Sequence, residues 1–338
     1  MSLFSAEEIK KSIQRNDTLL SLYRKLKIKW INYFAEHGEV PRRLNHLFIR
    51  LNSDPILQLK IRKKICDSLQ KNASEINKKL AQQIEVEGYA IVDFNDININ
   101  SENALTYIEN IVNTFRAKEL DKNAYQDLNS GKYEGKALCY HLYVNDKINP
   151  AIDPFMQLIC NRNMIEIATL YLGYLPTLDF TNVMMTPIQD GKQFGAQLWH
   201  KDLHHKKSLK IFFTPLDLTL EHGPFQFFPP RFSTLKYFRY SPQSSTDEQL
   251  EKTGLNVKDA ITFFGGKGKV LFVDTARCLH RGGMSKVTRY TATAAYCSPI
   301  HSFNQNNFRL TTHYNTIFNT HRLENEMILK EFLGFTNK

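Results

Sequence analysis

Beyond Leu178 the chain consists of short runs rich in β-branched and aromatic residues, separated by Gly, Pro, Asp and charged turns. These runs are FTNVMMTPI, SLKIFFTPLDL, GPFQFFP, KVLFVDT and RYTATAAY. Before them, helical spacing of apolar residues predicts helices over 105–115 and 154–172. Helices followed by many short strands indicate an α+β protein built around a β-sandwich or barrel. The sequence has no GxGxxG and no GxxxxGK[ST] motif, so a nucleotide-binding fold has no support.

The first eighty residues carry helix signals instead of strand signals. Ser5 and Glu8 form a capping-box pattern, which predicts a first helix that begins near Ser5. Apolar residues at helical spacing predict a second helical stretch over 56–80. From Ile84 the segment EVEGYAIVDF is typical of a strand. We therefore expect a helical extension over residues 1–83 and a catalytic domain over 84–338, which ends in an amphipathic helix near 321–335.

The net charge of +10 is concentrated in that extension. Residues 1–80 hold 17 of the 44 Lys and Arg and 8 of the 34 Asp and Glu, which is +9 and leaves +1 for the remainder. This basic face is either a solvated surface or a docking surface for an anionic partner. We expect no nucleic-acid partner, because residues 1–80 lack interleaved aromatic residues and zinc-finger spacing.

Two further patterns bear on where the protein works. No stretch reaches the roughly 18 apolar residues that a membrane helix needs, and the opening MSLFSAEEIKKS carries acidic residues. The five cysteines are scattered and form no C-x-x-C pair, which argues against a disulfide framework or a zinc knuckle. We expect a soluble, cytoplasmic protein without a membrane span.

The segment GAQLWHKDLHH carries the most chemical information. His200 and Asp202 are two residues apart, so on a strand both side chains face one side and can reach one metal ion. His280 ends the strand-like run KVLFVDTARCLH and is the candidate third ligand from a neighbouring strand. Two histidines and one carboxylate on one face of an octahedron leave three adjacent positions open, as in non-haem Fe(II) oxygenases.

Arg289 strengthens this interpretation. It lies nine residues beyond His280, across a Gly-containing turn and at the start of the strand RYTATAAY. A hairpin of that size returns its guanidinium to the interior that His280 faces. The fixed fork of Arg suits a carboxylate, such as the distal one of 2-oxoglutarate.

Several alternatives stay open at this point. His204 or His205 could replace a ligand, and Lys210 or Gln197 could touch 2-oxoglutarate, whereas Arg281 should project to the opposite face of its strand. The three ligands could also hold zinc in a hydrolase or isomerase, which leaves Arg289 without a role. A binding protein without turnover is a third reading.

The order of these motifs resembles the phytanoyl-CoA hydroxylase-like Fe(II)/2-oxoglutarate-dependent dioxygenases. The resemblance covers about residues 84–298 and rests on these segments: EGYAIVDF, a helix ending in YLG, WHKD, LKIFFTPLDLTLEHGPFQFFP, LFVDTARCLHRGG and the following Arg289. It implies a double-stranded β-helix (jelly-roll, cupin-like) core with flanking helices. It further implies Fe(II) held by His200, Asp202 and His280, with 2-oxoglutarate and O2 as cosubstrates and Arg289 on the C5 carboxylate.

The resemblance also implies a reaction class and shows one departure. Related halogenating enzymes lack the ligand carboxylate, so the presence of Asp202 favours hydroxylation of a small-molecule, carrier-linked or CoA-linked substrate. After GPFQ the family usually has a Pro-Gly-Ser-His turn, where this chain has Pro230, Arg231 and Phe232. Because proline fixes φ near −65°, that turn must be built differently. No candidate ligand lies in it.

Overall fold

The structure is a computed structural model, and the parts of the chain that it describes are residues 55–119, 140–143, 153–188, 193, 195–202, 207–232 and 244–297. The expected helices before residue 55 and over 321–335 lie outside these residues. Within them, no helix combines the length and the apolar character that crossing a bilayer requires.

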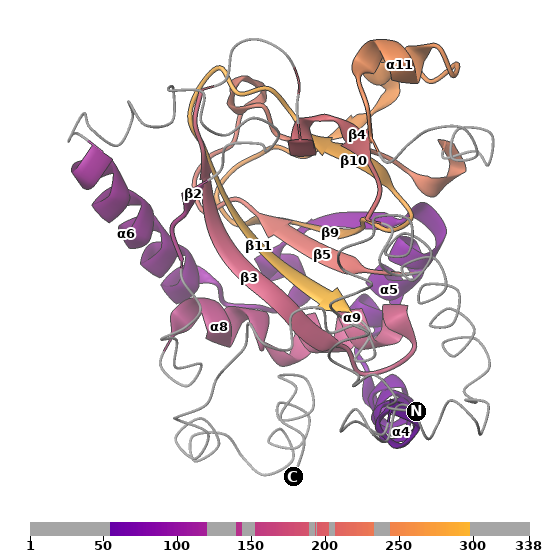
Figure 1. The fold of residues 1–338 in the computed structure, drawn as a ribbon. Coiled ribbons are helices and arrows are strands. Elements are labelled where there is room, and N and C mark those ends of the chain that lie inside the picture. The colour runs from indigo at the N-terminus through magenta and orange to yellow at the C-terminus, as the bar shows by residue number, and fades with distance from the viewer. Residues whose placement is uncertain are drawn as a thin grey trace, which may run out of the picture.

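Helices precede and flank a set of short strands (Figure 1). The α-helices are α4 (Pro55–Asn72), α5 (Glu75–Glu87), α6 (Glu102–Glu119), α8 (Pro154–Ile159), α9 (Arg162–Leu172) and α11 (Asp247–Glu251). The 3-10 helices are η1 (Phe94–Ile97), η3 (Gly195–Gln197), η4 (Leu220–His222), η5 (Pro230–Phe232) and η6 (Val257–Asp259). The strands are β1 (Tyr89–Asp93), β2 (Tyr140–His141), β3 (Thr177–Thr186), β4 (Trp199–His200), β5 (Leu209–Phe213), β6 (Phe225–Phe228), β7 (Ser244–Ser245), β8 (Ile261–Thr262), β9 (Lys269–Asp274), β10 (Leu279–Gly282) and β11 (Arg289–Cys297).

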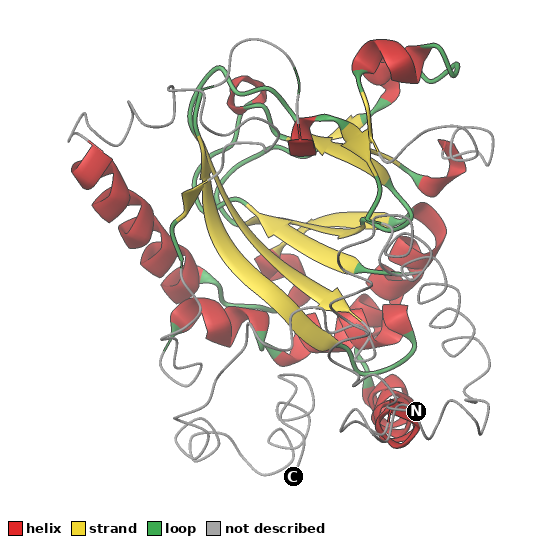
Figure 2. Cartoon of the chain, in the orientation of Figure 1, coloured by secondary structure: helices red, strands yellow, loops and turns green. Residues whose placement is uncertain are grey.

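In the described part of the chain, the strands form two antiparallel sheets (Figure 2). One has six strands in the order β1-β9-β5-β11-β3-β2, and the other has five in the order β7-β4-β10-β6-β8. Strands adjacent in each sheet are distant in sequence, as β5 and β11 are. The α+β class predicted from the sequence is confirmed at this level, as helices combined with two antiparallel sheets.

Alternation along the strands separates two faces of the six-stranded sheet. On β11, Tyr290, Ala292, Ala294 and Tyr296 are buried in one core with residues of α5, α6, α8 and α9. Figure 1 shows these helices on the side of the sheet away from β4 and β10. Because successive strand residues point to opposite faces, Arg289 and Thr293 face the five-stranded sheet instead. The polar side of β11 is therefore the side on which β4 and β10 lie.

Two segments predicted as single helices are each divided in the structure. The stretch predicted over 56–80 forms α4 and α5, because the Ser74 hydroxyl accepts a hydrogen bond from Asn77 N (3.2 Å) and caps a new helix. The stretch over 154–172 forms α8 and α9, with Asn161 as the second cap. Since α5 runs past Ile84 into the shared core, the division at residue 84 stays a prediction.

The run KVLFVDTARCLH also divides, at Asp274. Its carboxylate accepts hydrogen bonds from the backbone N–H groups of Ser208 (3.2 Å), Ala276 (2.8 Å) and Arg277 (3.1 Å), and from the Tyr171 hydroxyl. These bonds turn the chain from β9 in one sheet to β10 in the other. Burial is the largest influence on the pKa of Asp274 and raises it to about 6 against these hydrogen bonds.

The raised pKa of Asp274 predicts a pH-dependent stability. The folded state holds the proton more tightly than the unfolded chain, whose Asp pKa is about 3.9, so stability falls as pH rises from about 4 to about 6. Asp274→Asn, which cannot ionise, should remove this dependence. Urea unfolding at pH 4 and pH 7 should show the free energy of unfolding of the natural chain falling by about 2 kcal/mol more than that of the variant. Parallel profiles would contradict the assignment.

The turn at Pro230 depends on a glycine from another segment. Residues Pro230–Phe232 form η5, and Arg231 pairs with Glu87 at the end of α5. Gly88 follows with φ +80°, and a Cβ there would lie 2.5 Å from Pro230 Cδ and 2.7 Å from Cys278 Sγ. The proline-containing turn thus packs on the backbone of the EGY motif, where a side chain has no room.

This contact can be tested against a matched glycine. Gly173 also ends a helix, with φ +78°, but a Cβ there meets nothing within 4 Å. Gly173→Ala should cost about 1 kcal/mol for the left-handed backbone alone. Gly88→Ala should cost about 1–3 kcal/mol more from overpacking against Pro230 and Cys278. The measurement is denaturant unfolding of both variants, and equal losses would remove the role assigned to the contact.

Candidate metal centre

The two candidate histidine ligands face each other across neighbouring strands. β10 pairs with β4 in a register that sets His280 opposite His200, and the ring centroids are 4.3 Å apart. Directly opposed residues in antiparallel strands project to the same face. Asp202 follows just beyond β4, where its backbone N–H donates to Thr275 O (3.0 Å). One ligand atom from each of the three residues lies within 4.8 Å of the other two.

Hydrogen bonds to the backbone set the orientation of both imidazoles. Nδ1 of His200 lies 2.7 Å from Leu198 O, and Nδ1 of His280 lies 3.0 Å from Cys278 O. A carbonyl oxygen only accepts, so Nδ1 of each ring carries a hydrogen, and Nε2 is the nitrogen left to bind a metal. Burial is the largest influence on the pKa of His280 and lowers it to about 3. That ring is therefore neutral near pH 7 and able to bind a metal.

Asp202 is held ionised by the ammonium group beside it. Burial opposes its ionisation and is the largest single influence on its pKa, but the pKa is lowered, chiefly by the Coulombic attraction of Lys210. Lys210 Nζ lies 2.7 Å from Asp202 Oδ2, and His280 Nε2 lies 3.8 Å from the same oxygen. The attraction of Lys210 for this oxygen is mainly Coulombic. Oδ2 itself is buried, and the Lys210 ammonium group is the cation that pairs with it.

This donor set fits a divalent metal ion. Two imidazoles with Nε2 lone pairs and a carboxylate oxygen, gathered at one place, are the ligands of the two-histidine, one-carboxylate centres. The backbone carbonyls behind each Nδ1 provide the outer support that metal-binding histidines usually have.

Arg289 lies beside the end of β10. Its Nη2 is 3.3 Å from the position that a Cβ on Gly282 would take, and it donates to Thr186 Oγ1 (3.3 Å). Gly282 is two residues beyond His280, which is about 6.6 Å along a strand. The missing side chain at Gly282 thus leaves room for the guanidinium. The structure thus places Arg289 beside Gly282, two residues along β10 from His280.

Arg281 faces the other way, as its position on the strand predicts. Its guanidinium pairs with Asp247, donates from Nε to Gln226 Oε1 (2.9 Å) and lies 4.5 Å from the centroid of the Trp199 ring. Trp199 is fully buried beside Phe228, on the face of the five-stranded sheet that α11 covers. Arg281 therefore acts as a structural residue on that face.

The other candidate residues lie at different places in the structure. Gln197 is buried in η3. Lys210, an alternative contact for 2-oxoglutarate, forms an ion pair with Asp202. His204 and His205 lie outside the described residues and stay alternative ligands. Cys278, two residues before His280, is buried in an apolar cluster with its Sγ 3.5 Å from Gly88 O.

Sequence reasoning missed the aromatic side of the site. The Phe225 ring stacks on the His280 ring at 5.3 Å, and Phe212 stacks on Phe225 at 4.5 Å. Phe227, on the strand beside His280, belongs to the same apolar cluster. The apolar alternation of the two runs was visible, but which phenylalanine meets His280 depends on strand register. These rings give the buried His280 an apolar surrounding on one side.

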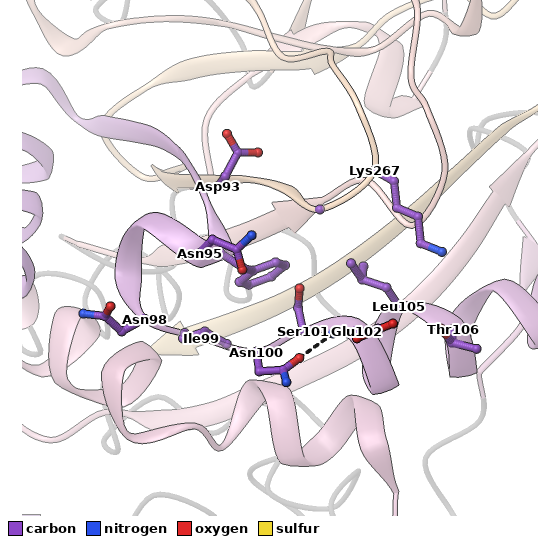
Figure 3. Close-up of a pocket in the computed structure, with 12 residues that line it drawn as sticks. Asp93, Asn95, Asn98, Ile99, Asn100, Ser101, Glu102, Leu105, Thr106 and Lys267 are labelled. Atoms are coloured by element: carbon purple, nitrogen blue, oxygen red, sulfur yellow. Dashed lines mark hydrogen bonds between the residues drawn. The ribbon is translucent and has the colours of Figure 1, made fainter.

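A separate pocket of about 720 Å³ lies at the start of α6 (Figure 3). Figure 3 shows the hydrogen bond that Asn100 Oδ1 accepts from the backbone N–H of Glu102, with the side chain of Ser101 between Asn100 and Leu105. The polar lining also includes Asp93, Asn95 and Lys267. Neither Arg289 nor any of the three candidate ligands lines this pocket.

Comparisons with known proteins give only a distant structural likeness. No protein-family model and no curated protein sequence matches the chain. The epimerase SnoN in complex with Fe3+, alpha ketoglutarate and nogalamycin RO aligns with a TM-score of 0.40 at 14% identity, over 66% of this chain and 84% of SnoN. AviO1 from Streptomyces viridochromogenes Tue57 aligns with a TM-score of 0.43 at 14% identity, over 67% and 97%. EctD from S. alaskensis, with 2-oxoglutarate and 5-hydroxyectoine, aligns with a TM-score of 0.41 at 15% identity, over 65% and 75%.

The ligand assignment predicts which substitutions remove metal. His200→Ala, Asp202→Ala and His280→Ala each delete one of three ligands and should abolish tight binding of Fe(II) or Co(II). His222→Ala is the control, because His222 sits in η4 and its Nδ1 accepts only from the Thr219 backbone and hydroxyl. Metal content after dialysis and the visible absorption of the Co(II) form report binding. Full retention in both His200→Ala and His280→Ala would move the assignment to His204 or His205.

Proposed function

We propose that the chain is an Fe(II)- and 2-oxoglutarate-dependent oxygenase, with His200, Asp202 and His280 as iron ligands. The observation that carries the proposal is the convergence of these three donor atoms within 4.8 Å, with Nδ1 of both histidines turned to backbone carbonyls. Arg289, beside Gly282 at the end of β10, is the proposed partner of the C5 carboxylate of 2-oxoglutarate. A hydrolytic zinc site would have no use for this arginine.

The protein's residues would hold and shield the reacting groups. Iron supplies the oxidative decarboxylation of 2-oxoglutarate by O2 and the transfer of one oxygen atom to a substrate C–H bond. His200, Asp202 and His280 would occupy one face of the ion and leave the opposite face to ligands. Arg289 would orient 2-oxoglutarate through its guanidinium fork, and the Phe225 and Phe212 rings would exclude water on one side.

The finer parts of the proposal concern fold, subfamily and substrate. Two facing antiparallel sheets with the site between them support a double-stranded β-helix core, and the motif order supports the phytanoyl-CoA hydroxylase-like subfamily. Asp202 supports hydroxylation, because the ligand position is filled by a carboxylate. The substrate class is a small molecule, free or linked to a carrier or CoA. The basic residues 1–83 would offer an anionic partner a cationic surface in a cytoplasmic protein.

The experiment that tests the function measures succinate. Purified protein with Fe(II), ascorbate and 2-oxoglutarate should form succinate slowly without any prime substrate. Addition of metabolite fractions should then accelerate 2-oxoglutarate consumption when the true substrate is present. The His280→Ala variant is the control for iron-dependent background oxidation. Tight zinc binding with no succinate under any of these conditions would favour the hydrolytic alternative.

Arg289→Gln should weaken the cosubstrate and leave the metal in place. Loss of a charge-assisted hydrogen bond costs about 1.5–3 kcal/mol, which corresponds to a rise of about 10- to 150-fold in the KM for 2-oxoglutarate. Arg281→Gln is the matched control, because that arginine faces Asp247 on the opposite side of the sheet. Steady-state kinetics with Fe(II) titrations check both points. An unaltered KM in Arg289→Gln would bring Lys210 forward as the cosubstrate's partner.

A further inference from the structure

Lys210 places a positive charge inside the site. It lies on β5 between Leu209 and Ile211, both of which are fully buried in the core beneath the helices. Because strand residues alternate, Lys210 points to the opposite face, where its Nζ reaches Asp202 Oδ2 at 2.7 Å. The stem also passes the Phe180 ring, whose centroid is 5.8 Å from Nζ. A lysine in an otherwise apolar strand costs desolvation, which its attraction to Asp202 offsets.

The charges at the ligand end of the site therefore cancel before any ion binds. Asp202 carries −1 and Lys210 carries +1, and neutral imidazoles are the form in which histidine binds metals. Lys210 Nζ, 2.7 Å from Asp202 Oδ2, is the cation beside this carboxylate. The other nearby cation, Arg289, lies at Gly282 and adds positive charge. A two-histidine, one-carboxylate site normally leaves a divalent ion with one uncompensated positive charge, and here it leaves two.

We propose that Lys210 couples metal binding to the binding of an anionic cosubstrate, so that the ion and a dicarboxylate enter the site together. This inference rests on the proposed function. The ion alone must bind against the ammonium group, which repels it and occupies the Asp202 oxygen. A dicarboxylate brings two negative charges, one beside the ion and Lys210 and one beside Arg289, and so lowers the net positive charge of the site. The two ligands therefore strengthen each other's binding by the same factor.

The test compares four chains by Co(II) titration under argon, with and without 2-oxoglutarate. Lys210→Met removes the charge and keeps an unbranched apolar stem, and Lys210→Arg keeps the charge. Lys207→Met is the matched control, because Lys207 pairs with Glu85 and stacks on Tyr171. Visible absorption of bound Co(II) and calorimetry give Kd values without turnover. Lys210→Gln serves as a second neutral variant if Lys210→Met has a lowered Tm.

In the natural chain, saturating 2-oxoglutarate should tighten Co(II) binding by about 10- to 100-fold, within the usual range of coupling between two sites. Lys210→Met should bind Co(II) alone about 10-fold more tightly than the natural chain and lose most of the enhancement. Lys210→Arg and Lys207→Met should keep it. Titration of 2-oxoglutarate with and without Co(II) should return the same factor.

Three results would overturn the inference. Equal enhancement in Lys210→Met and the natural chain would show that the lysine does not couple the ligands. Weaker Co(II) binding by a folded Lys210→Met would show that Lys210 only supports Asp202, with the opposite sign. Failure of the natural chain to bind Co(II) with or without 2-oxoglutarate would reject the metal centre itself, and the proposed function would fail separately from the coupling.

Discussion

The antiparallel pairing of β4 with β10 is the contact on which the site depends. It sets His280 opposite His200 and turns both rings toward the space between the two sheets. A slip of one residue would turn His280 to the face that Trp199, Phe228 and Leu279 pack with α11, and would bring Arg281 inward. The ion pair of Arg281 with Asp247 on the outer face therefore opposes that slip. Register and chemistry are determined by the same strand pair.

The turn between β9 and β10 is the second feature on which the candidate site depends. Asp274 gathers three backbone N–H groups and the Tyr171 hydroxyl, and so ends β9 in one sheet before β10 begins in the other. The backbone carbonyl of Thr275 in the same turn accepts from the backbone N–H of Asp202, which holds the candidate carboxylate ligand beside the histidines. Gly88 packs against Pro230 and Cys278 near this turn. A buried hydrogen-bonding turn thus links the helical layer to the candidate ligands.

The space between the sheets contains both aromatic rings and positive charge. Phe212, Phe225 and Phe227 are apolar neighbours of His280, and Lys210 and Arg289 add positive charge to the same space. Such a space favours a ligand with two negative ends beside a metal ion over a neutral one, because buried positive charge without compensation is costly. The proposed cosubstrate and the proposed coupling follow from this positive charge.

The sequence by itself determined the residues of the candidate site and the class of fold. Residues two apart on a strand share a face, so His200 and Asp202 could be predicted together, and the hairpin length predicted Arg289 on the same side. Helix ends were less well predicted, because Ser74 and Asn161 begin new helices within continuous apolar patterns. Tertiary structure alone decided three contacts: Lys210 with Asp202, Phe225 with His280, and Gly88 with Pro230. Each joins segments that are distant in sequence or belong to different sheets. Periodicity states which face a residue occupies but not which residue lies across from it, and that depends on register and packing.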